Sequence, residues 1–317
     1  MSKCLVIGAN GFLGSHLVDA LADLGHEVTA FDRFSSQGSQ YTSENVRPYV
    51  GDFLNTSDLA EALRGQELVF HFLSTTNPAT ADSEPTLDIR TNISQSVEFF
   101  KLCVDQGIQK IYFASTGGAI YGDQGLPKYG EMDLTLPVSP YGIGKLTLEN
   151  YLRYFRTKHG LESVSLRISN PYGPRQHPHR KQGLIPIALR QIALDQPVIR
   201  YGAGTMTRDY IYVKDVSRII AGIAGMPLNH QTYNLGSARG YTVTEVLDTI
   251  KEVTGRDFEV RELQRPPTFV ESVILDTSRL EAELPQEVFP LSRLRDGIAA
   301  TWEEQLRSVE NTEYPVS

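Results

Sequence analysis

The chain begins with a short apolar run, a glycine-rich turn and a segment with helical periodicity. Residues 3–7 read as a strand, and leucines recur at helical spacing after the turn, at positions 13, 17, 21 and 24. Glycines in such a turn permit a tight bend and let the backbone approach a pyrophosphate group. The pattern predicts a strand–turn–helix unit that binds a dinucleotide through Gly8, Gly11, Phe12, Leu13 and Gly14. A generic strand–helix turn without a ligand is the alternative interpretation.

Acidic residues follow the next two expected strands. Asp32 comes after residues 27–31, about 20 residues beyond the glycine turn, where a carboxylate accepts hydrogen bonds from an adenosine ribose. This charge favours NAD over NADP, whose 2′-phosphate it repels, although Arg33 beside it could pair with that phosphate. The strand expected at residues 47–53 contains Asp52 and Phe53. We expect these two residues near the adenine, and a simple turn or cap role for Asp52 is the alternative.

Short apolar strands continue to alternate with helical segments. A fourth strand is expected at residues 69–73, and Phe72, Leu73 and Ser74 lie at its end, where open α/β sheets bind ligands. A helix that contains Asn92 and a strand at residues 110–114 follow. The alternation predicts an α/β protein with a Rossmann-like, doubly wound parallel sheet. Because 317 residues can form two lobes, we expect a smaller C-terminal α/β domain for the substrate.

Tyr141 and Lys145 stand four residues apart at the start of an expected helix, directly after Pro140. Residues at this spacing share one helical face, and a neighbouring ammonium favours the phenolate of tyrosine, which can then act as a base. The same spacing recurs in two other pairs, so spacing alone is weak support. We expect the pair at 154 and 158 to face away on the same helix, and the pair at 210 and 214 to lie along a strand, too far apart for contact.

Hydroxyl groups end the strand that precedes this helix. Ser115 and Thr116 are followed by Gly117 and Gly118, at the edge of the sheet that faces the first glycine turn. One of the hydroxyls could hydrogen-bond a substrate hydroxyl during oxidation, or both could bond locally in a turn. His71 is flanked by apolar residues, so we expect it in the core rather than in catalysis.

Composition excludes several classes of function. A net charge of −8 and a pI near 5.4 argue against nucleic acid as the main partner, because phosphate backbones require a basic face. Cys4 and Cys103 lie in apolar segments and cannot form a disulfide framework. No apolar stretch is long enough to span a membrane, so we expect a cytoplasmic protein without a membrane partner. His177 and His179 lack an obvious third ligand, so no metal site is predicted.

These motifs together resemble the extended short-chain dehydrogenase/reductases, and among them the nucleotide-sugar epimerase/dehydratase family. The matching segments occur in family order over most of the chain: 8–14, Asp32, 52–53, Asn92, 115–116, 121–122, Tyr141, Lys145, 170–175 and 208–210. The resemblance implies a homodimer joined by helices near residues 92–105 and 141–158. It also implies an NAD-binding domain at residues 1–169, to which the chain returns near residues 209–237 and 270–277. A UDP-sugar-binding domain is implied mainly at residues 170–317.

The residues after the strand-end threonine separate the reactions of this family. Dehydratases typically carry Asp-Glu there and decarboxylases of UDP-glucuronate Ser-Glu, whereas the glycines after Thr116 look like those of UDP-glucose 4-epimerases. The resemblance therefore implies NAD-dependent C4 epimerisation of a UDP-hexose, with Tyr141 as base, Lys145 as its support and Thr116 or Ser115 as the catalytic hydroxyl; we expect Thr116. The alternatives are a dehydrogenase or reductase with net redox change, and a non-catalytic nucleotide-binding module.

Substrate contacts are also implied by the resemblance. Family members bind the UDP diphosphate through arginines that match Arg208 and Arg265, with an added amide from Asn170 and a further contact near Tyr201. The acid that follows the second arginine in the family is missing, with Thr268 nearby. A small residue at the position of Ser272 or Val273 implies tolerance of UDP-GlcNAc and UDP-GalNAc beside UDP-Glc and UDP-Gal, for polysaccharide precursors. Because the loop at residues 176–182 contains basic residues, UDP-uronic acids are an alternative class of substrate.

Overall fold

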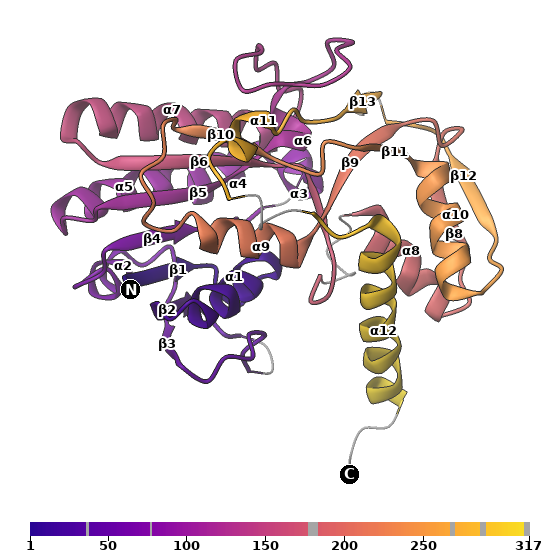
Figure 1. Ribbon diagram of the computed structural model, residues 1–317, viewed down its shortest axis with the longest axis horizontal. Helices are drawn as coiled ribbons and strands as arrows, with labels where there is room; N and C mark the ends of the chain where they lie inside the picture. The colour runs from indigo at the N-terminus through magenta and orange to yellow at the C-terminus, as the bar shows by residue number, and fades with distance from the viewer. Residues whose placement is uncertain (36–37, 77, 177–182, 267–269, 286–289, 314–317) are drawn as a thin grey trace.

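A computed structural model describes residues 1–35, 38–76, 78–176, 183–266, 270–285 and 290–313. Figure 1 shows a large lobe around one sheet and a smaller lobe that holds the C-terminal helix. His177 and His179, which were considered as metal ligands, lie outside the described residues, and so does Thr268. Within the described part, no helix has the length and hydropathy needed to cross a membrane.

The large lobe contains seven strands in one parallel sheet. The strand order is β10-β6-β5-β4-β1-β2-β3, and every neighbouring pair runs parallel. The strands are β1 (Lys3–Ile7), β2 (Glu27–Asp32), β3 (Val46–Val50), β4 (Leu68–His71), β5 (Lys110–Thr116), β6 (Glu162–Ile168) and β10 (Thr232–Leu235). From β1 the sheet continues through β2 to β3 in one direction, and from β4 it continues through β5 and β6 to β10 in the other. The crevice at the carboxyl ends of β1 and β4 is therefore the place where a doubly wound sheet binds its ligand.

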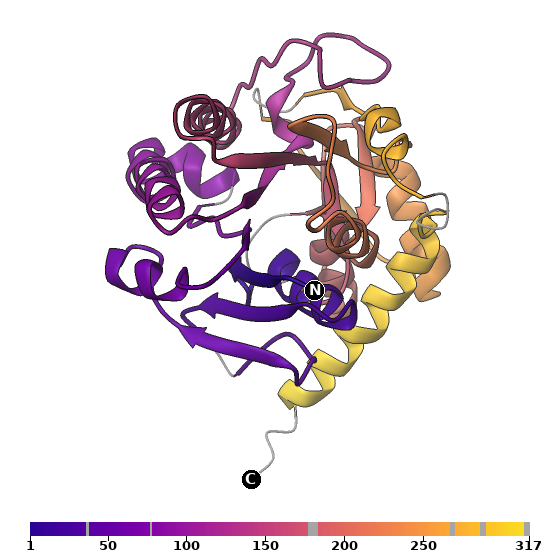
Figure 2. The same ribbon diagram turned by 60° about the vertical axis from the view of Figure 1, so that its left-hand side comes forward.

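Helices cover both faces of this sheet, as the turned view in Figure 2 shows. On one face, α1 (Phe12–Asp23) and α9 (Val213–Gly222) pack against side chains such as Val6, Phe70 and Tyr112. On the other face, α2 (Thr56–Ala62), α5 (Gln95–Asp105) and α7 (Pro140–His159) pack against Ile7, Val69 and Phe113. Successive strand residues alternate between the two cores, as the pleat requires. Apolar strand sequences follow because both faces are buried.

Short elements connect β4 to α7 and shape the crevice. They are α3 (Pro78–Ser83), α4 (Pro85–Asp88), the π-helix η1 (Ile89–Ser94) and α6 (Gly117–Ile120). A π-helical turn widens the backbone spacing locally and often occurs at functional sites. Here it lies between α4 and α5 and contains Asn92.

The smaller lobe packs three helices against short strands. Its helices are α8 (Leu184–Ala193), α10 (Val243–Thr254) and α12 (Leu294–Glu313), and Trp302 is buried among them. The strands β7 (Asn170–Tyr172), β9 (Thr207–Tyr212), β11 (Gly240–Thr242) and β13 (Ser272–Val273) form one sheet, and β8 (Val198–Tyr201) pairs with β12 (Val260–Leu263). The remaining short helix is α11 (Ser278–Glu281). The domain boundary at residue 169 stays a prediction.

Three expected strand limits are wrong in detail. The third strand ends at Val50 rather than residue 53, and the fourth at His71 rather than residue 73. Lys214 does not lie on a strand, because β9 ends at Tyr212 and α9 begins at the next residue. In each case the chain turns at the carboxyl edge of a strand, and apolar content alone does not mark that turn.

Candidate active site

The glycine turn brings β1 and α1 into close contact. Gly8 has φ +85°, and a Cβ on it would lie 2.8 Å from the Leu73 backbone nitrogen. A Cβ on Gly14 would lie 2.0 Å from the Gly8 carbonyl oxygen. The N-cap of α1 is Gly11, which has no side-chain cap, so the first amides of the helix at Phe12 and Leu13 face the turn without a competing side chain. This geometry fits a pyrophosphate at the start of α1.

Asp32 is the last residue of β2, whereas Asp52 lies two residues beyond the end of β3, and the two have different surroundings. Asp32 accepts backbone N–H groups of Asn10 at 3.0 Å and Arg33 at 2.8 Å, which fixes its carboxylate beside the glycine turn, as a ribose ligand requires. Asp52 accepts the Leu54 amide at 2.9 Å in a local turn. Phe53 packs in the core against His71 and Phe99. An adenine contact from Asp52 or Phe53 stays a prediction.

The loop after β4 is fixed to the glycine turn on one side and to η1 on the other. The Phe72 amide donates to the Ile7 carbonyl at 3.0 Å, and Leu73 packs against Gly8. The Ser74 hydroxyl donates to the Thr76 carbonyl at 2.7 Å. Asn92 is buried and accepts the Thr75 amide at 2.9 Å, so its side chain positions this loop.

Tyr141 and Lys145 lie on the first turns of α7, as expected from their spacing. Ser139 caps the helix by accepting the Gly142 amide at 3.2 Å. The Lys145 ammonium is buried, donates to the Ala114 carbonyl at 2.7 Å, and lies 5.8 Å from the centre of the Tyr141 ring. This places both side chains beside the carboxyl end of β5. Leu73, Ser74, Asn92 and Leu148 line the same narrow cavity.

The expected lowering of the Tyr141 pKa is wrong for this structure. Burial, with a smaller contribution from Asp88, raises the pKa of Tyr141 to about 12. Burial also lowers the pKa of Lys145 to about 8, against the opposing effects of Asp88 and Glu149. The spacing identified the pair, but it did not reveal how strongly desolvation and the Asp88 carboxylate oppose the phenolate.

The strand-end hydroxyls have different environments. Ser115 donates to Oε1 of Glu149 at 2.5 Å, and Arg167 binds the same carboxylate through Nε at 3.1 Å and Nη2 at 2.8 Å. Arg167 also donates to the Tyr121 hydroxyl at 3.0 Å. Thr116 points to the other side of the strand, and among the described residues its hydroxyl has no hydrogen-bond partner. This difference favours Thr116 over Ser115 as the hydroxyl for a substrate.

Both structural interpretations made for nearby residues are confirmed. Tyr154 is 47 % exposed and accepts a hydrogen bond from Lys158 at 2.9 Å, so this second pair lies on the protein surface. His71 is buried among phenylalanines, with Nε2 at 2.8 Å from the Ser96 hydroxyl. Burial lowers the pKa of His71 to about 3, which leaves the ring neutral.

The expected substrate residues gather on strands of the smaller lobe. Asn170 donates to the Asp209 carbonyl at 2.9 Å, and its amide lies 3.4 Å from a Cβ placed on Gly118, beside the end of β5. Arg208 donates to the backbone carbonyls of residues 207, 270 and 271. Arg265 pairs with Glu271.

The remaining expected substrate residues, Ser272 or Val273 and Tyr201, also lie on strands of the smaller lobe. Ser272 is half-buried, whereas Val273 is 1 % exposed and packs in the core, so only Ser272 remains as a candidate for the sugar pocket. Tyr201 is 38 % exposed at the end of β8.

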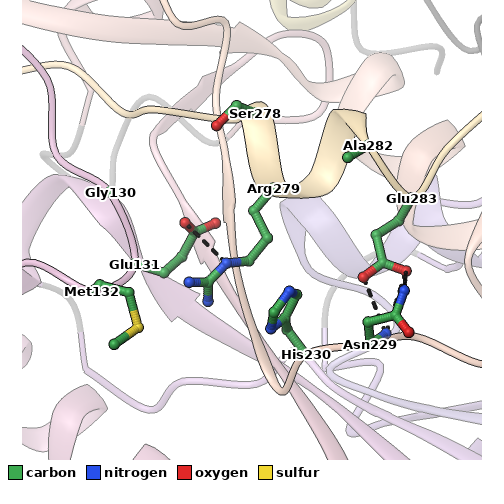
Figure 3. A pocket seen from close by; sticks show the side chains of 9 residues that line it. All are labelled: Gly130, Glu131, Met132, Asn229, His230, Ser278, Arg279, Ala282 and Glu283. Carbon is green, nitrogen blue, oxygen red and sulfur yellow. Dashed lines mark hydrogen bonds and ion pairs between the residues drawn. The ribbon is translucent and has the colours of Figure 1, made fainter.

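A larger hollow of about 420 Å³ lies elsewhere, against the edge strand β10 (Figure 3). Its charged side chains are already engaged. Glu131 accepts the Asn234 amide at 2.8 Å and pairs with Arg279, which donates to the Thr232 carbonyl at 3.2 Å. Glu283 accepts the Asn229 amide at 3.0 Å. The cavity beside Tyr141 therefore remains the candidate site.

Four polar residues of the site were missed by the motif reasoning: Thr76, Asp88, Glu149 and Arg167. Two of them carried a signal in the sequence. Asp88 precedes Asn92 by one helical turn, and Glu149 follows Lys145 by one turn, so each shares a helical face with a residue already selected.

Comparison with known proteins agrees with this geometry. The model of the NAD dependent epimerase/dehydratase family matches residues 4–236. A dTDP-4-dehydro-6-deoxyglucose reductase of Escherichia coli is 31 % identical over 93 % of this chain and 94 % of its own length.

Two solved structures share the whole fold. The UDP-glucose 4-epimerase of Thermotoga maritima with UDP-glucose has a TM-score of 0.88 and 33 % identity, over 96 % of this chain and 99 % of that one. The UDP-glucose 4-epimerase of Thermus thermophilus in complex with NAD has a TM-score of 0.87 and 32 % identity, over 95 % and 98 % of the two chains. The chain belongs to the NAD-dependent epimerase/dehydratase family of enzymes, and its cofactor is NAD.

Proposed function

We propose that the protein interconverts C4 epimers of a UDP-hexose through a transient 4-keto sugar. The observation that carries the proposal is the placement of Tyr141 and Lys145 beside a strand end with no carboxylate following it, where the Thr116 hydroxyl has no hydrogen-bond partner in the described part of the chain. The dehydratases and decarboxylases of the family that the chain resembles typically carry an acidic residue at that strand end. Bound NAD would supply a hydride acceptor for C4 and, in its reduced form, a hydride donor, so the reaction would have no net redox change.

The side chains of this chain divide the remaining work. Tyr141 removes the proton from the C4 hydroxyl, and the Lys145 ammonium stabilises the phenolate that this step requires. Thr116 orients the C4 hydroxyl. Asn170, Arg208 and Arg265 hold the diphosphate, for which the planar guanidinium groups are suited. Gly8, Gly11 and Gly14 would hold the pyrophosphate of NAD, and Asp32 would hold its adenosine ribose.

The small side chain of Ser272 supports a pocket that accepts N-acetylated hexoses. We propose UDP-GlcNAc and UDP-GalNAc as substrates together with UDP-Glc and UDP-Gal, in the supply of polysaccharide precursors. The second candidate function is a net redox reaction on a nucleotide sugar, because one of the relatives is a reductase.

Proton NMR of the purified enzyme with separate UDP-sugars decides between these reactions. UDP-Glc, UDP-GlcNAc and UDP-glucuronate would each be incubated without added cofactor. The proposal expects the C4 epimers of UDP-Glc and UDP-GlcNAc to appear. Conversion to a keto sugar only with stoichiometric NAD(P)+, which takes up the hydride, would establish a dehydrogenase with net redox change instead. A preference of about 100-fold or more for UDP-Glc over UDP-GlcNAc would contradict the assignment of Ser272.

The roles of the two strand-end hydroxyls predict opposite phenotypes. Thr116→Val should lower kcat by about 10-fold or more and leave stability nearly unchanged, because the hydroxyl acts on substrate. Ser115→Ala should keep most activity but destabilise the fold by about 1.5–3 kcal/mol, because the hydroxyl donates to the Glu149 carboxylate. Urea unfolding and initial rates on both variants measure this, and the reverse pattern would assign catalysis to Ser115.

We also propose a homodimer joined through α5 and α7. The outer face of α7 exposes Ile143, Tyr151 and Tyr154, at 50 %, 39 % and 47 % of their surfaces. Apolar side chains grouped on one helical face are typical of a surface that a partner covers. Sedimentation equilibrium at micromolar concentration should give twice the chain mass of 35.3 kDa, and a monomer would contradict the proposal.

A further inference from the structure

A buried carboxylate lies beside the Tyr141–Lys145 pair and belongs to a different segment of the chain. Asp88, at the end of α4, is 4 % exposed. A Cβ on Gly144 would lie 2.5 Å from its Oδ2. The carboxylate therefore packs directly on the backbone of α7, at the residue between Tyr141 and Lys145. It lines the same narrow cavity as both side chains.

The other oxygen of this carboxylate is held by neutral donors. Oδ1 accepts the Thr76 hydroxyl at 2.5 Å and the Asn92 amide at 2.8 Å. Thr76 and Asn92 also bond each other at 2.8 Å, which closes a small buried network. Neither donor carries a charge, so the negative charge of Asp88 is not offset by its own hydrogen-bond partners.

The second acidic group near Lys145 is neutralised. Glu149 lies one turn further along α7 and is bound through both oxygens by Arg167, with Ser115 as a third donor. The remaining titratable neighbour is His71, whose ring is neutral. Among the described carboxylates near Lys145, Asp88 is thus the one without a cationic partner of its own, and it raises the pKa of Lys145 more than the paired Glu149 does.

We propose that Asp88 is the buried counter-charge of the Tyr141–Lys145 pair, a positioning residue that keeps Lys145 protonated and fixes α7 against the loop after β4. The expected effect on catalysis rests on the proposed function, whereas the effect of Asp88 on the ionisation of Lys145 does not. Removing the carboxylate removes the favourable partner of a buried ammonium, so the Lys145 charge is lost at lower pH. The direction agrees with the contribution of Asp88 to the pKa of Lys145, which lies at about 8.

The test measures the ionisation of Lys145 without any turnover. Lysine Cε is isotopically labelled, its chemical shift is followed against pH by NMR, and the Lys145 signal is assigned by its loss in Lys145→Met. Asp88→Asn keeps an oxygen that accepts from Thr76 and Asn92 and removes only the charge. The pKa of Lys145 should fall by about one unit or more in this variant.

A matched variant separates charge from structure. Thr76→Val removes a hydrogen bond to Asp88 but keeps its charge, so the pKa of Lys145 should stay within about 0.3 units of the unsubstituted protein. Equal shifts in Asp88→Asn and Thr76→Val would assign Asp88 a purely structural role and overturn the proposal. An unchanged Lys145 pKa in Asp88→Asn would overturn it as well.

The catalytic consequence supplies a second readout. Because Lys145 must be charged to stabilise the phenolate, the basic limb of kcat/KM against pH should move to lower pH in Asp88→Asn by the same amount. Absence of epimerase activity in the unsubstituted protein would refute the proposed function and leave the NMR result valid.

A stability measurement covers the case in which Asp88→Asn folds poorly. Lys145→Met leaves the carboxylate buried without its cation, so the double variant Asp88→Asn/Lys145→Met should be more stable than Lys145→Met alone. A double variant that is less stable than Lys145→Met would contradict the counter-charge.

Discussion

Replacing Tyr141 with phenylalanine is expected to lower kcat by about 10²–10⁴ while the protein still folds and binds NAD. The substitution removes the hydroxyl that takes the proton and keeps the ring beside Lys145. The Michaelis constant should change little, because the loss concerns an interaction made in the transition state. Initial rates of epimerisation, with NAD content read from the absorbance of the denatured enzyme, measure both effects.

Tyr154→Phe is the matched control for this prediction. Tyr154 lies on the same helix, has a lysine at the same spacing and is exposed. Its hydroxyl accepts from Lys158 and does not line the cavity beside Tyr141, so kcat should stay within about two-fold. Similar losses in the two variants would point to damage of α7 rather than to a base. Activity of Tyr141→Phe within about 10-fold of the unsubstituted enzyme would refute the assigned role.

Glu149→Ala is expected to destabilise the protein by about 3–5 kcal/mol, the largest loss of stability that we predict. The carboxylate and the Arg167 guanidinium are 8 % and 7 % exposed, and two nitrogens of Arg167 bind the two oxygens of Glu149. Removing one partner leaves a buried guanidinium without its anion. The free energy of unfolding in urea measures the loss for the large lobe.

Two further variants test the origin of this loss. Glu162→Ala breaks the exposed pair with Arg156 and should cost about 1 kcal/mol or less. The double variant Glu149→Met/Arg167→Met removes both charges, so it should be more stable than Glu149→Ala. If Glu149→Ala costs no more than Glu162→Ala, the buried pair does not support the end of β5.

The fold was predictable from local patterns because each pattern reports a local requirement. Glycines at 8, 11 and 14 are needed where a strand and a helix approach closely, and the 2.0 Å separation at Gly14 is that requirement in the structure. Tyr141 and Lys145 were found because a helix brings residues four apart together. The parallel sheet followed from apolar strands that alternate with helices.

The electrostatic environment of the site was not predictable in the same way. Asp88 reaches Gly144 across 56 positions of sequence, and only the packing of α4 on α7 brings them together. The pKa of Tyr141 depends on that contact and on burial, so spacing alone gave the wrong direction. The preference for Thr116 over Ser115 came from the resemblance, and its structural reason is the pleat of β5, which sends neighbouring side chains to opposite faces.

The side chains over β10 also determine how the sheet ends. Strand β10 is an edge, and its outward carbonyl at Thr232 and outward amide at Asn234 are the groups through which a further strand would pair. Arg279 and Glu131 occupy these two groups and are paired with each other. An edge that is blocked in this way cannot template the backbone of another molecule. The ion pair therefore disfavours edge-to-edge association through β10.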